Sequence, residues 1–219
     1  HRAVDLASID LINGSMSFDT NRPATRAELI VEGLDRVLLD QAAVDLPGNS
    51  KRNTITWRTG SEQPILMSLK VFDAYEMWRV TRIFRLEIPH TDVVFDTADA
   101  SIRDDQEPYL QETLGPLLEA VKKYDDIAAE LYIAGYTDTV GSPSSNLTLS
   151  EKRAKSIASW FAKNGVGIPI YYQGFGEAVQ AVPTADEVDE QANRRAIYLL
   201  TNARPSSPDF PQTNWKRVN

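Results

Sequence analysis

The chain has 219 residues, of which 42% are hydrophobic and 25% charged, a composition typical of a globular protein with one large domain or two modest ones. Its formal net charge of −8 excludes a protein that binds nucleic acid through clustered Lys and Arg. The chain has no cysteine and two histidines, which excludes disulfides and argues against zinc sites and histidine-based catalysis, so we expect no metal and no cofactor.

The first half, residues 1–90, predicts a small α+β domain of unknown role. Asn13-Gly14 lies between alternating apolar residues and predicts a β-hairpin with a two-residue turn. A helix is expected next, because Thr25 and Glu28 have the spacing of a capping box. The apolar residues of one helical face are then Ile30, Leu34, Val37 and Leu38. After a break at residues 47–49, strands are expected in TITW, PILMSLKVF and RVTRIFRLEI.

The second half, residues 91–205, alternates strands and helices more regularly. A strand at 93–95 precedes a helix over about 104–124, in which Pro116 predicts a kink or a displaced first turn. Further strands are expected in AAELYIAG, IYYQGFG and RAIYLL, with a helix over 149–163 that begins at a capping box formed by Thr148 and Glu151. This order predicts a β-α-β-α-β-(α)-β mixed sheet with its helices on one face. Residues 206–219 contain prolines and are expected to form an extended or mobile tail.

One turn of the second half places a carboxylate where ligands often bind. Gly135 and Gly141 bracket Asp138 after a predicted strand, and in open α/β sheets ligands lie at the carboxyl ends of the strands. Arg153 follows in the second turn of the expected helix, close to its buried face. These opposite charges fit either a simple ion pair or a socket for a zwitterion, and their spacing does not decide between the two.

Three strings of the second half resemble a known family. In chain order they are VVFDTADASIRDDQEPYLQETLGPLLEAV, GYTDTVGSPSSNLTLSEKRAKSIASWF and QGFGEAVQAVPTADEVDEQANRRAIYLL. Over residues 92–204 they resemble the OmpA-like C-terminal peptidoglycan-binding domain, a family that includes the peptidoglycan-associated lipoprotein, the flagellar stator B subunit and the C-terminal domain of the porin-like outer-membrane protein. The resemblance rests on a Gly-x-Thr-Asp turn, an Asn-x-x-Leu-Ser-x-x-Arg-Ala segment and an Asn-Arg-Arg triplet.

The resemblance implies a non-catalytic domain that clamps the diaminopimelate of the peptidoglycan stem peptide. Asp138 would receive the ammonium group, and Arg153 would pair with the neighbouring carboxylate through a planar fork that Lys cannot reproduce. Asn146 would line the pocket and steady the loop, and Arg194 or Arg195 would bring a second positive group. The expected binding residues are Asp138, Thr139, Asn146, Leu149, Arg153 and Arg194.

Two positions depart from the pattern of some family members. Ala98 and Val140 stand where those members have polar residues, which bears on affinity and on the preference for stem peptides. Arg195 also fits a purely structural role, in which it braces the acidic segment 186–190.

Two alternative functions stay open on the sequence. A glycan hydrolase would use two carboxylates, such as Asp138 with Glu151 or Glu130, although the chain has 31 acidic residues and chance proximity is common. A protein-interaction module of the envelope would use the first half and would have lost binding to the wall.

The resemblance also implies a place in the cell. We expect a periplasmic protein whose partner is peptidoglycan, with a second envelope protein bound by residues 1–90. Because the chain begins at His1 rather than at Met, we expect an export signal or an anchor in the inner or outer membrane to have been removed. Whether the protein forms a homodimer stays open.

Overall fold

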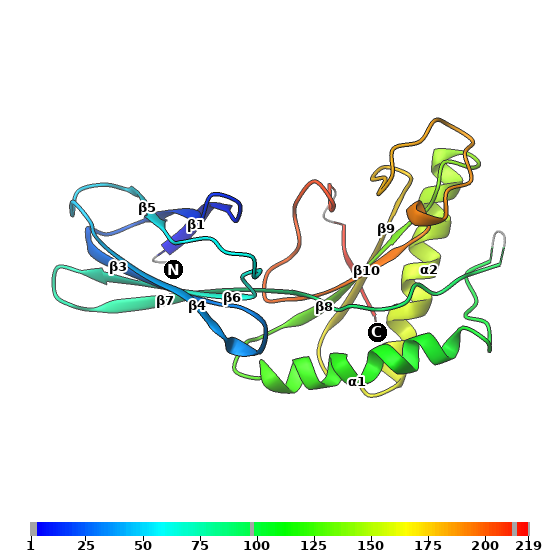
Figure 1. The fold of residues 1–219 in the computed structure, drawn as a ribbon, viewed down its shortest axis with the longest axis horizontal. Helices are drawn as coiled ribbons and strands as arrows, with labels where there is room; N and C mark the ends of the chain where they lie inside the picture. The colour runs from blue at the N-terminus through cyan, green and yellow to red at the C-terminus, as the bar shows by residue number, and fades with distance from the viewer. Residues whose placement is uncertain (1–3, 97–98, 212–213, 219) are drawn as a thin grey trace. The chain divides into compact units, whose positions relative to one another are not determined.

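The computed structural model describes residues 4–96, 99–211 and 214–218, and the chain divides into two compact units, His1–Phe84 and Arg85–Asn219 (Figure 1). Unit 1 and unit 2 each have their own secondary structure and core. Both α-helices found in the described residues belong to unit 2, which confirms the mixed α+β fold class.

Unit 1 consists of antiparallel strands in two groups with the orders β1-β2-β5 and β4-β3-β6-β7. The elements are β1 Val4–Asp10, β2 Ser15–Thr20, β3 Ala24–Glu32, the short 3₁₀ helix η1 Leu34–Arg36, β4 Leu38–Asp45, β5 Arg52–Thr56, β6 Leu66–Asp73 and β7 Trp78–Glu87. The part of β7 up to Phe84 pairs with β6. The predicted hairpin is confirmed as β1 and β2, but its connection has four residues, 11–14, and ends at Gly14 with φ +65°.

The helix expected near residues 25–38 is wrong, because those residues form β3, η1 and the start of β4. In β3 the buried side chains are Ala27, Leu29 and Val31, which recur every second residue as in a strand with one buried face. β3 has strand partners on both sides, β4 and β6, and this pairing overrides the helical spacing of the apolar residues. The supposed helical face is exposed instead: Ile30, Leu34, Val37 and Leu38.

The core of unit 1 lies between its two groups of strands. Its buried side chains come from β2, β3, β5 and β6 and include Met16, Phe18, Leu29, Ile55, Met67 and Leu69. Their alternation along each strand follows the period of two seen in the sequence.

Unit 2 contains a mixed sheet with the order β11-β9-β8-β10, extended by residues 85–87 of β7, which pair with β10. The elements are α1 Glu107–Lys123, β8 Glu130–Tyr136, α2 Pro143–Lys163, β9 Ile170–Gly176, the 3₁₀ helix η2 Gln191–Asn193, β10 Ala196–Thr201 and β11 Lys216–Arg217. β8 and β9 are parallel, and the other pairs are antiparallel. α1 continues through Pro116.

Helix α2 packs directly onto β8 and β9 through two glycines. A Cβ on Gly135 would lie 2.5 Å from the carbonyl oxygen of Ser150, and a Cβ on Gly174 would collide with the backbone nitrogen of Glu151. The absence of side chains at these two positions therefore lets the helix lie close to the strand ends that carry the candidate site.

The opposite face of this sheet is covered by the C-terminal segment. Phe210 and Trp215 are buried against Tyr132, Tyr136 and Phe175, and β11 pairs with β9. The tail was expected to be extended or mobile; the described part of residues 206–219 includes the extended strand β11 and is packed on the sheet. The apolar contacts of these aromatic side chains hold the tail on the sheet.

Residues 93–95 were predicted to be a strand, but they lie outside the strands of the sheet. The backbone N–H of Val94 is bound by Gln106 Oε1 at 2.9 Å, and Val93 is buried. A side chain thus takes the place of a strand partner for this segment. Among the described residues, no helix combines the length and the apolar character that crossing a bilayer requires.

Candidate functional site

Asp138 lies in a turn just beyond the carboxyl end of β8. The turn begins where the Thr137 N–H donates to the carbonyl of Gly176 at 2.9 Å, and it reaches Gly141, whose φ of +94° suits glycine. Asn146 braces the turn, since its Nδ2 lies 3.3 Å from the carbonyl oxygen of Asp138 and 3.1 Å from that of Val140. Asp138 is 7% exposed, so its carboxylate is held in a largely buried position.

Helix α2 begins at Pro143, six residues before its predicted start at 149. Ser142 is the N-cap, and its Oγ accepts from the Ser145 N–H at 3.3 Å. Proline at the first helical position needs no partner for its nitrogen, which favours this start over the predicted capping box. The Thr148 hydroxyl donates to the Ser144 carbonyl at 3.0 Å, as a residue inside the helix.

The earlier start puts three of the predicted site residues on one stripe of α2. Asn146, Leu149 and Arg153 are spaced i, i+3 and i+7, so they follow one another along the helix surface. Asn146 is buried and Leu149 is half-buried. Asn146 Nδ2 also lies 2.5 Å from Glu177 Oε2, beyond the end of β9.

Arg153 is anchored by backbone carbonyls rather than by a carboxylate. Its Nε donates to the carbonyl of Asp99 at 3.0 Å and its Nη2 to that of Asp96 at 3.1 Å, while the guanidinium lies 5.1 Å from the ring centroid of Phe95. Burial lowers the pKa of Arg153 and the nearby charge of Arg194 lowers it further, while Asp138 and Asp99 oppose the shift. Neither of these two bonds uses Nη1.

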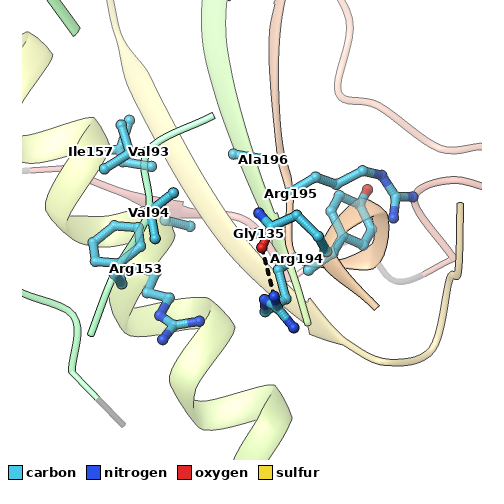
Figure 2. Close-up of a pocket in the computed structure, with 12 residues that line it drawn as sticks. Val93, Val94, Gly135, Arg153, Ile157, Arg194, Arg195 and Ala196 are labelled. Atoms are coloured by element: carbon cyan, nitrogen blue, oxygen red, sulfur yellow. Dashed lines mark hydrogen bonds between the residues drawn. The ribbon is translucent and has the colours of Figure 1, made fainter. Parts of the chain in front are cut away.

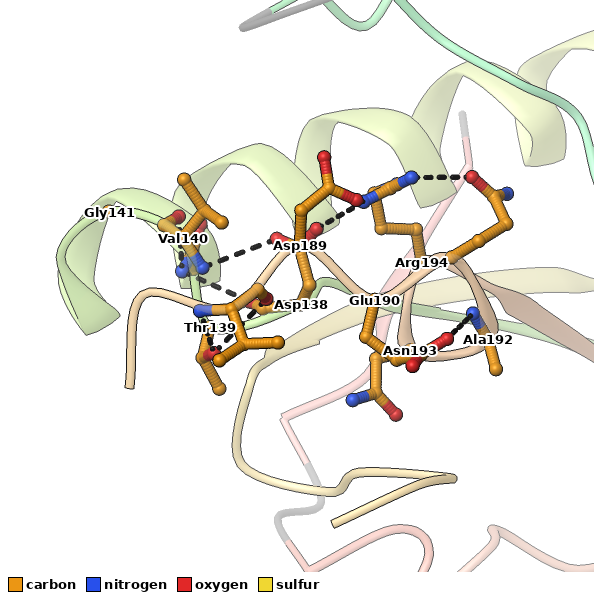
Figure 3. Close-up of polar contacts among 12 residues, drawn as sticks. Asp138, Thr139, Val140, Gly141, Asp189, Glu190, Ala192, Asn193 and Arg194 are labelled. Atoms are coloured by element: carbon orange, nitrogen blue, oxygen red, sulfur yellow. Dashed lines mark hydrogen bonds and ion pairs between the residues drawn. The ribbon is translucent and has the colours of Figure 1, made fainter. Parts of the chain in front are cut away.

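Arg194 holds the carboxylate of Asp138 (Figure 3). Its Nη1 contacts one oxygen of Asp138 and one of Asp189, and its Nη2 donates to Gln191 Oε1 at 2.5 Å. The hydrogen bond to Asp189 raises the pKa of Arg194, burial opposes this, and the bond to Asp138 adds to it. The arginine therefore links the turn after β8 to the acidic segment before β10.

A small cavity of about 40 Å³ lies beside these groups. Its walls come from the 93–95 segment, the end of β8, α2 and residues 191–196, and both Arg153 and Arg194 line it. Figure 2 shows the side chains of Arg153 and Arg194 reaching toward the same opening from separate elements, whereas Arg195 points away. The cavity is large enough for a single charged group, so a larger ligand has to extend out of its mouth.

Thr139 was expected among the binding residues, but its side chain is hydrogen-bonded to the acidic segment. Its Oγ1 donates to the carbonyl of Ala185 at 2.7 Å and accepts from the Val188 N–H at 3.1 Å. Its carbonyl accepts from the Glu187 N–H at 3.0 Å. The side chain thus attaches the acidic segment to the turn.

The two arginines of the triplet have different partners. Arg195 lies 4.3 Å from the ring centroid of Tyr136, and its Nη1 donates to the carbonyl of Val179 at 3.4 Å. The acidic segment is braced by Arg194, through Asp189, and not by Arg195 as the alternative prediction had it. Asn193 is buried and fixes the loop, since its amide bonds both the N–H and the carbonyl of Val182.

Of the two positions that depart from the family pattern, the structure describes Val140. Val140 is exposed, and its N–H donates to Asp138 Oδ1 at 3.3 Å. Ala98 lies outside the described residues. Within the described ranges, no group of three or more His, Asp or Glu side chains is arranged to hold a metal ion.

Sequence reasoning missed several groups of the site. Asp189 and Gln191 orient Arg194, Glu177 contacts Asn146, and the carbonyls of Asp96 and Asp99 hold Arg153. Backbone carbonyls carry no side-chain signal. Asp189 lies in the acidic segment 186–190, where nothing in the sequence singles out one carboxylate, and no spacing in the sequence links Glu177 to Asn146.

Comparisons with known proteins place this site within one matched region. The family model described as OmpA family matches residues 94–195. The chain is 30% identical to outer membrane protein A of Serratia odorifera over 125 residues, which are 57% of this chain and 49% of that protein. It is 32% identical to the probable lipoprotein YiaD of Escherichia coli strain K12 over 117 residues, 53% of this chain and 50% of that protein.

The chain therefore spans about half the length of these two curated relatives. Among solved structures, the peptidoglycan-associated lipoprotein from Burkholderia pseudomallei matches 50% of this chain and 88% of its own, with 23% identity and a TM-score of 0.38.

Proposed function

Because residues 94–195 form an OmpA family domain, a family whose domains associate with peptidoglycan, we propose that this chain binds peptidoglycan without catalysis, through the diaminopimelate of the stem peptide. The observation that carries the proposal is that Arg153 and Arg194 line one cavity, while Arg194 also holds the carboxylate of Asp138. Diaminopimelate has an ammonium and a carboxylate on one carbon, and a site with both signs of charge complements it.

Ligand binding involves an exchange at Asp138. The ligand ammonium replaces Arg194 as the partner of the Asp138 carboxylate. Arg194 stays hydrogen-bonded to Asp189 and Gln191 and pairs with the ligand carboxylate. Nη1 of Arg153 provides a second donor to that carboxylate, since Nε and Nη2 are used by backbone carbonyls. Asn146 keeps the turn, and with it the carboxylate, in place. Thr139 acts indirectly by positioning the acidic segment, and the half-buried Leu149 lies between Asn146 and Arg153 on the same stripe of α2.

Of the two carboxylate pairs considered for a hydrolase, Asp138 with Glu130 is too far apart for that chemistry. Glu130 begins β8 and Asp138 follows its end, and a strand of this length spans roughly 20 Å at about 3.3 Å per residue. Glycosidases need carboxyl groups about 5–9.5 Å apart. Glu151 is paired with Lys216 Nζ at 2.5 Å. These placements favour a binding protein over an enzyme.

The proposal implies a role in the cell envelope. Residues 94–195 attach the chain to the wall in the periplasm, and unit 1 connects an envelope protein or complex to that attachment. The membrane tether expected from the sequence belongs to this same proposal. Binding of peptidoglycan requires neither the tether nor the connection made by unit 1.

Calorimetric titration with diaminopimelate and pull-down with insoluble peptidoglycan test the proposal. Asp138→Asn removes the negative charge with little change in shape, and we expect binding in both assays to fall at least about tenfold. Asp19→Asn is the matched control, because Asp19 forms a comparable ion pair with Arg52 in unit 1. Unchanged pull-down by Asp138→Asn would favour the protein-interaction alternative, and release of soluble fragments from the wall would favour a hydrolase.

A further inference from the structure

Unit 1 has an open groove of about 610 Å³ between the connection at residues 20–24 and the strands β6 and β7. We propose that this groove binds an extended acidic peptide of a partner protein, which pairs as an added strand with the edge of β7 near Trp78–Val80. The proposal concerns unit 1 alone and is independent of peptidoglycan binding by unit 2.

The first observation is the strand edge itself. On one side, β7 pairs with β6 along Trp78–Phe84. On its other side, β7 pairs with β10 only at residues 85–87, so among the described residues the edge of Trp78–Phe84 has no partner strand. Trp78 is 56% exposed and Val80 42% exposed, as expected for an edge. An unpaired edge presents backbone N–H and C=O groups that an extended peptide can bind.

The second observation is a buried hydroxyl without a partner. Thr20 ends β2, lines the groove and is 6% exposed. Its Oγ1 has no hydrogen-bond partner within the described part of the chain. A buried polar group in this state is costly, and a peptide N–H or C=O in the groove would satisfy it.

The third observation is charge. Arg22 and Arg79 both line the groove and are exposed, and neither side chain forms a hydrogen bond or an ion pair within the described residues. The one carboxylate in the lining, Asp73, is already bound by the N–H groups of Tyr75 and Met77 at 2.9 and 3.1 Å. The groove is therefore basic in a chain whose net charge is −8, which favours an acidic occupant.

The same charges argue against a second copy of this chain as the occupant. β7 carries Arg79, Arg82 and Arg85, and two antiparallel copies would bring these arginines close to one another across the new pair. Exposed Met77, Trp78 and Val80 offer apolar contacts to alternate side chains of the peptide. The expected partner segment thus alternates Glu or Asp with apolar residues.

Fluorescence anisotropy with the full chain tests this with a defined probe, a fluorescein-labelled peptide of alternating Glu and Val. We expect the Glu peptide to bind at least about tenfold more tightly than the same peptide with Lys for Glu, and Arg79→Glu to reverse that preference. Arg217→Glu, with the same charge change on β11 of unit 2, should leave both affinities unchanged. A Glu peptide that is N-methylated at alternate amides should bind at least tenfold more weakly, because it cannot pair as a strand.

Thr20→Val separates binding from folding. It should weaken binding of the Glu peptide without lowering the melting temperature, because the hydroxyl it removes has no partner in the protein. Equal binding of the N-methylated peptide or of the Lys peptide would overturn the proposal, as would no binding of the Glu peptide up to about 1 mM. Asp138→Asn should leave peptide binding unchanged, so failure of one proposal does not decide the other.

Discussion

Arg194 and Asp138 form an ion pair in which the buried carboxylate of the turn after β8 is held by the first arginine of the Asn-Arg-Arg triplet. The pair keeps the Asp138 charge compensated before any ligand arrives. Asp189 binds the same Nη1 atom, so Arg194 would keep one ion-pair partner when a ligand ammonium pairs with Asp138. In the proposed binding mode, a ligand therefore has to replace an existing ion pair of Asp138.

We predict that Asp189→Asn weakens diaminopimelate binding about two- to fivefold, the range of an exposed ion pair. Without Asp189, Arg194 binds Asp138 alone and competes more strongly with the ligand ammonium. Calorimetry measures the effect, and Asp186→Asn in the same loop is the control. If Asp189→Asn binds as tightly as the wild type, Asp189 has no part in the exchange.

Arg153→Lys should lower affinity about tenfold although the charge is kept, since one ammonium cannot hold two carbonyls and also offer a flat pair of donors. The two carbonyls are those of Asp96 and Asp99, 3.1 and 3.0 Å from the guanidinium. Arg52→Lys, at the exposed pair with Asp19, should have no effect on binding. A lysine variant with full affinity would show that charge alone is recognised at this position.

Much of the second unit could be predicted from sequence, because the alternating strands and the apolar helical stripes agree with turn residues at their ends. Asp138, Asn146 and Arg153 are brought to one place by β8 and α2, two elements whose existence was predicted. What could not be predicted is which guanidinium meets Asp138. That depends on the long connection between β9 and β10, whose course is set by loop hydrogen bonds to Thr139 and Asn193.

The first unit was harder to predict because its apolar spacing fits two structures. Residues 25–38 satisfy a helical pattern at Ile30, Leu34 and Leu38 and a strand pattern at Ala27, Leu29 and Val31. Pairing with β4 and β6 decides in favour of the strand, and such long-range pairing is not visible locally. The packing of the tail was not predicted for a similar reason, since Phe210 and Trp215 contact residues of strands distant in the sequence.

Because α2 lies so close to β9, we predict that adding one methyl group at Gly174 lowers the stability of the protein strongly. Gly174→Ala places a Cβ against the backbone of Glu151, where neither element can move easily, and should destabilise the protein by about 3 kcal/mol. Gly115→Ala is the matched control, because nothing lies within 4 Å of its Cβ and alanine favours the helix, so it should stabilise by up to about 1 kcal/mol. Urea unfolding measures both. Equal stabilities of the two variants would contradict the packing described for α2.

His90 predicts a pH dependence of stability. Burial opposes its protonation, but hydrogen bonds to Asp92 and to the carbonyl of Ile88 outweigh burial and raise its pKa. Nδ1 lies 2.8 Å from that carbonyl and Nε2 3.5 Å from Asp92 Oδ1, which also accepts from the Ala196 N–H at 2.8 Å. The folded state therefore holds the proton more tightly than the unfolded state, and protonation stabilises the start of β10.

Because of this difference in proton affinity, His90 makes the protein less stable as the pH rises. The contribution of His90 to the free energy of unfolding is fully present below the pKa of an unfolded histidine, about 6.5, and is lost as pH rises through the higher folded value. Urea unfolding between about pH 5.5 and 8.5 should show this fall in the wild type and in His1→Gln, the other histidine of the chain. His90→Gln should lose it, and so should Asp92→Asn in part, because His90 keeps its bond to Ile88. A fall of equal size in His90→Gln would assign the pH dependence to other groups.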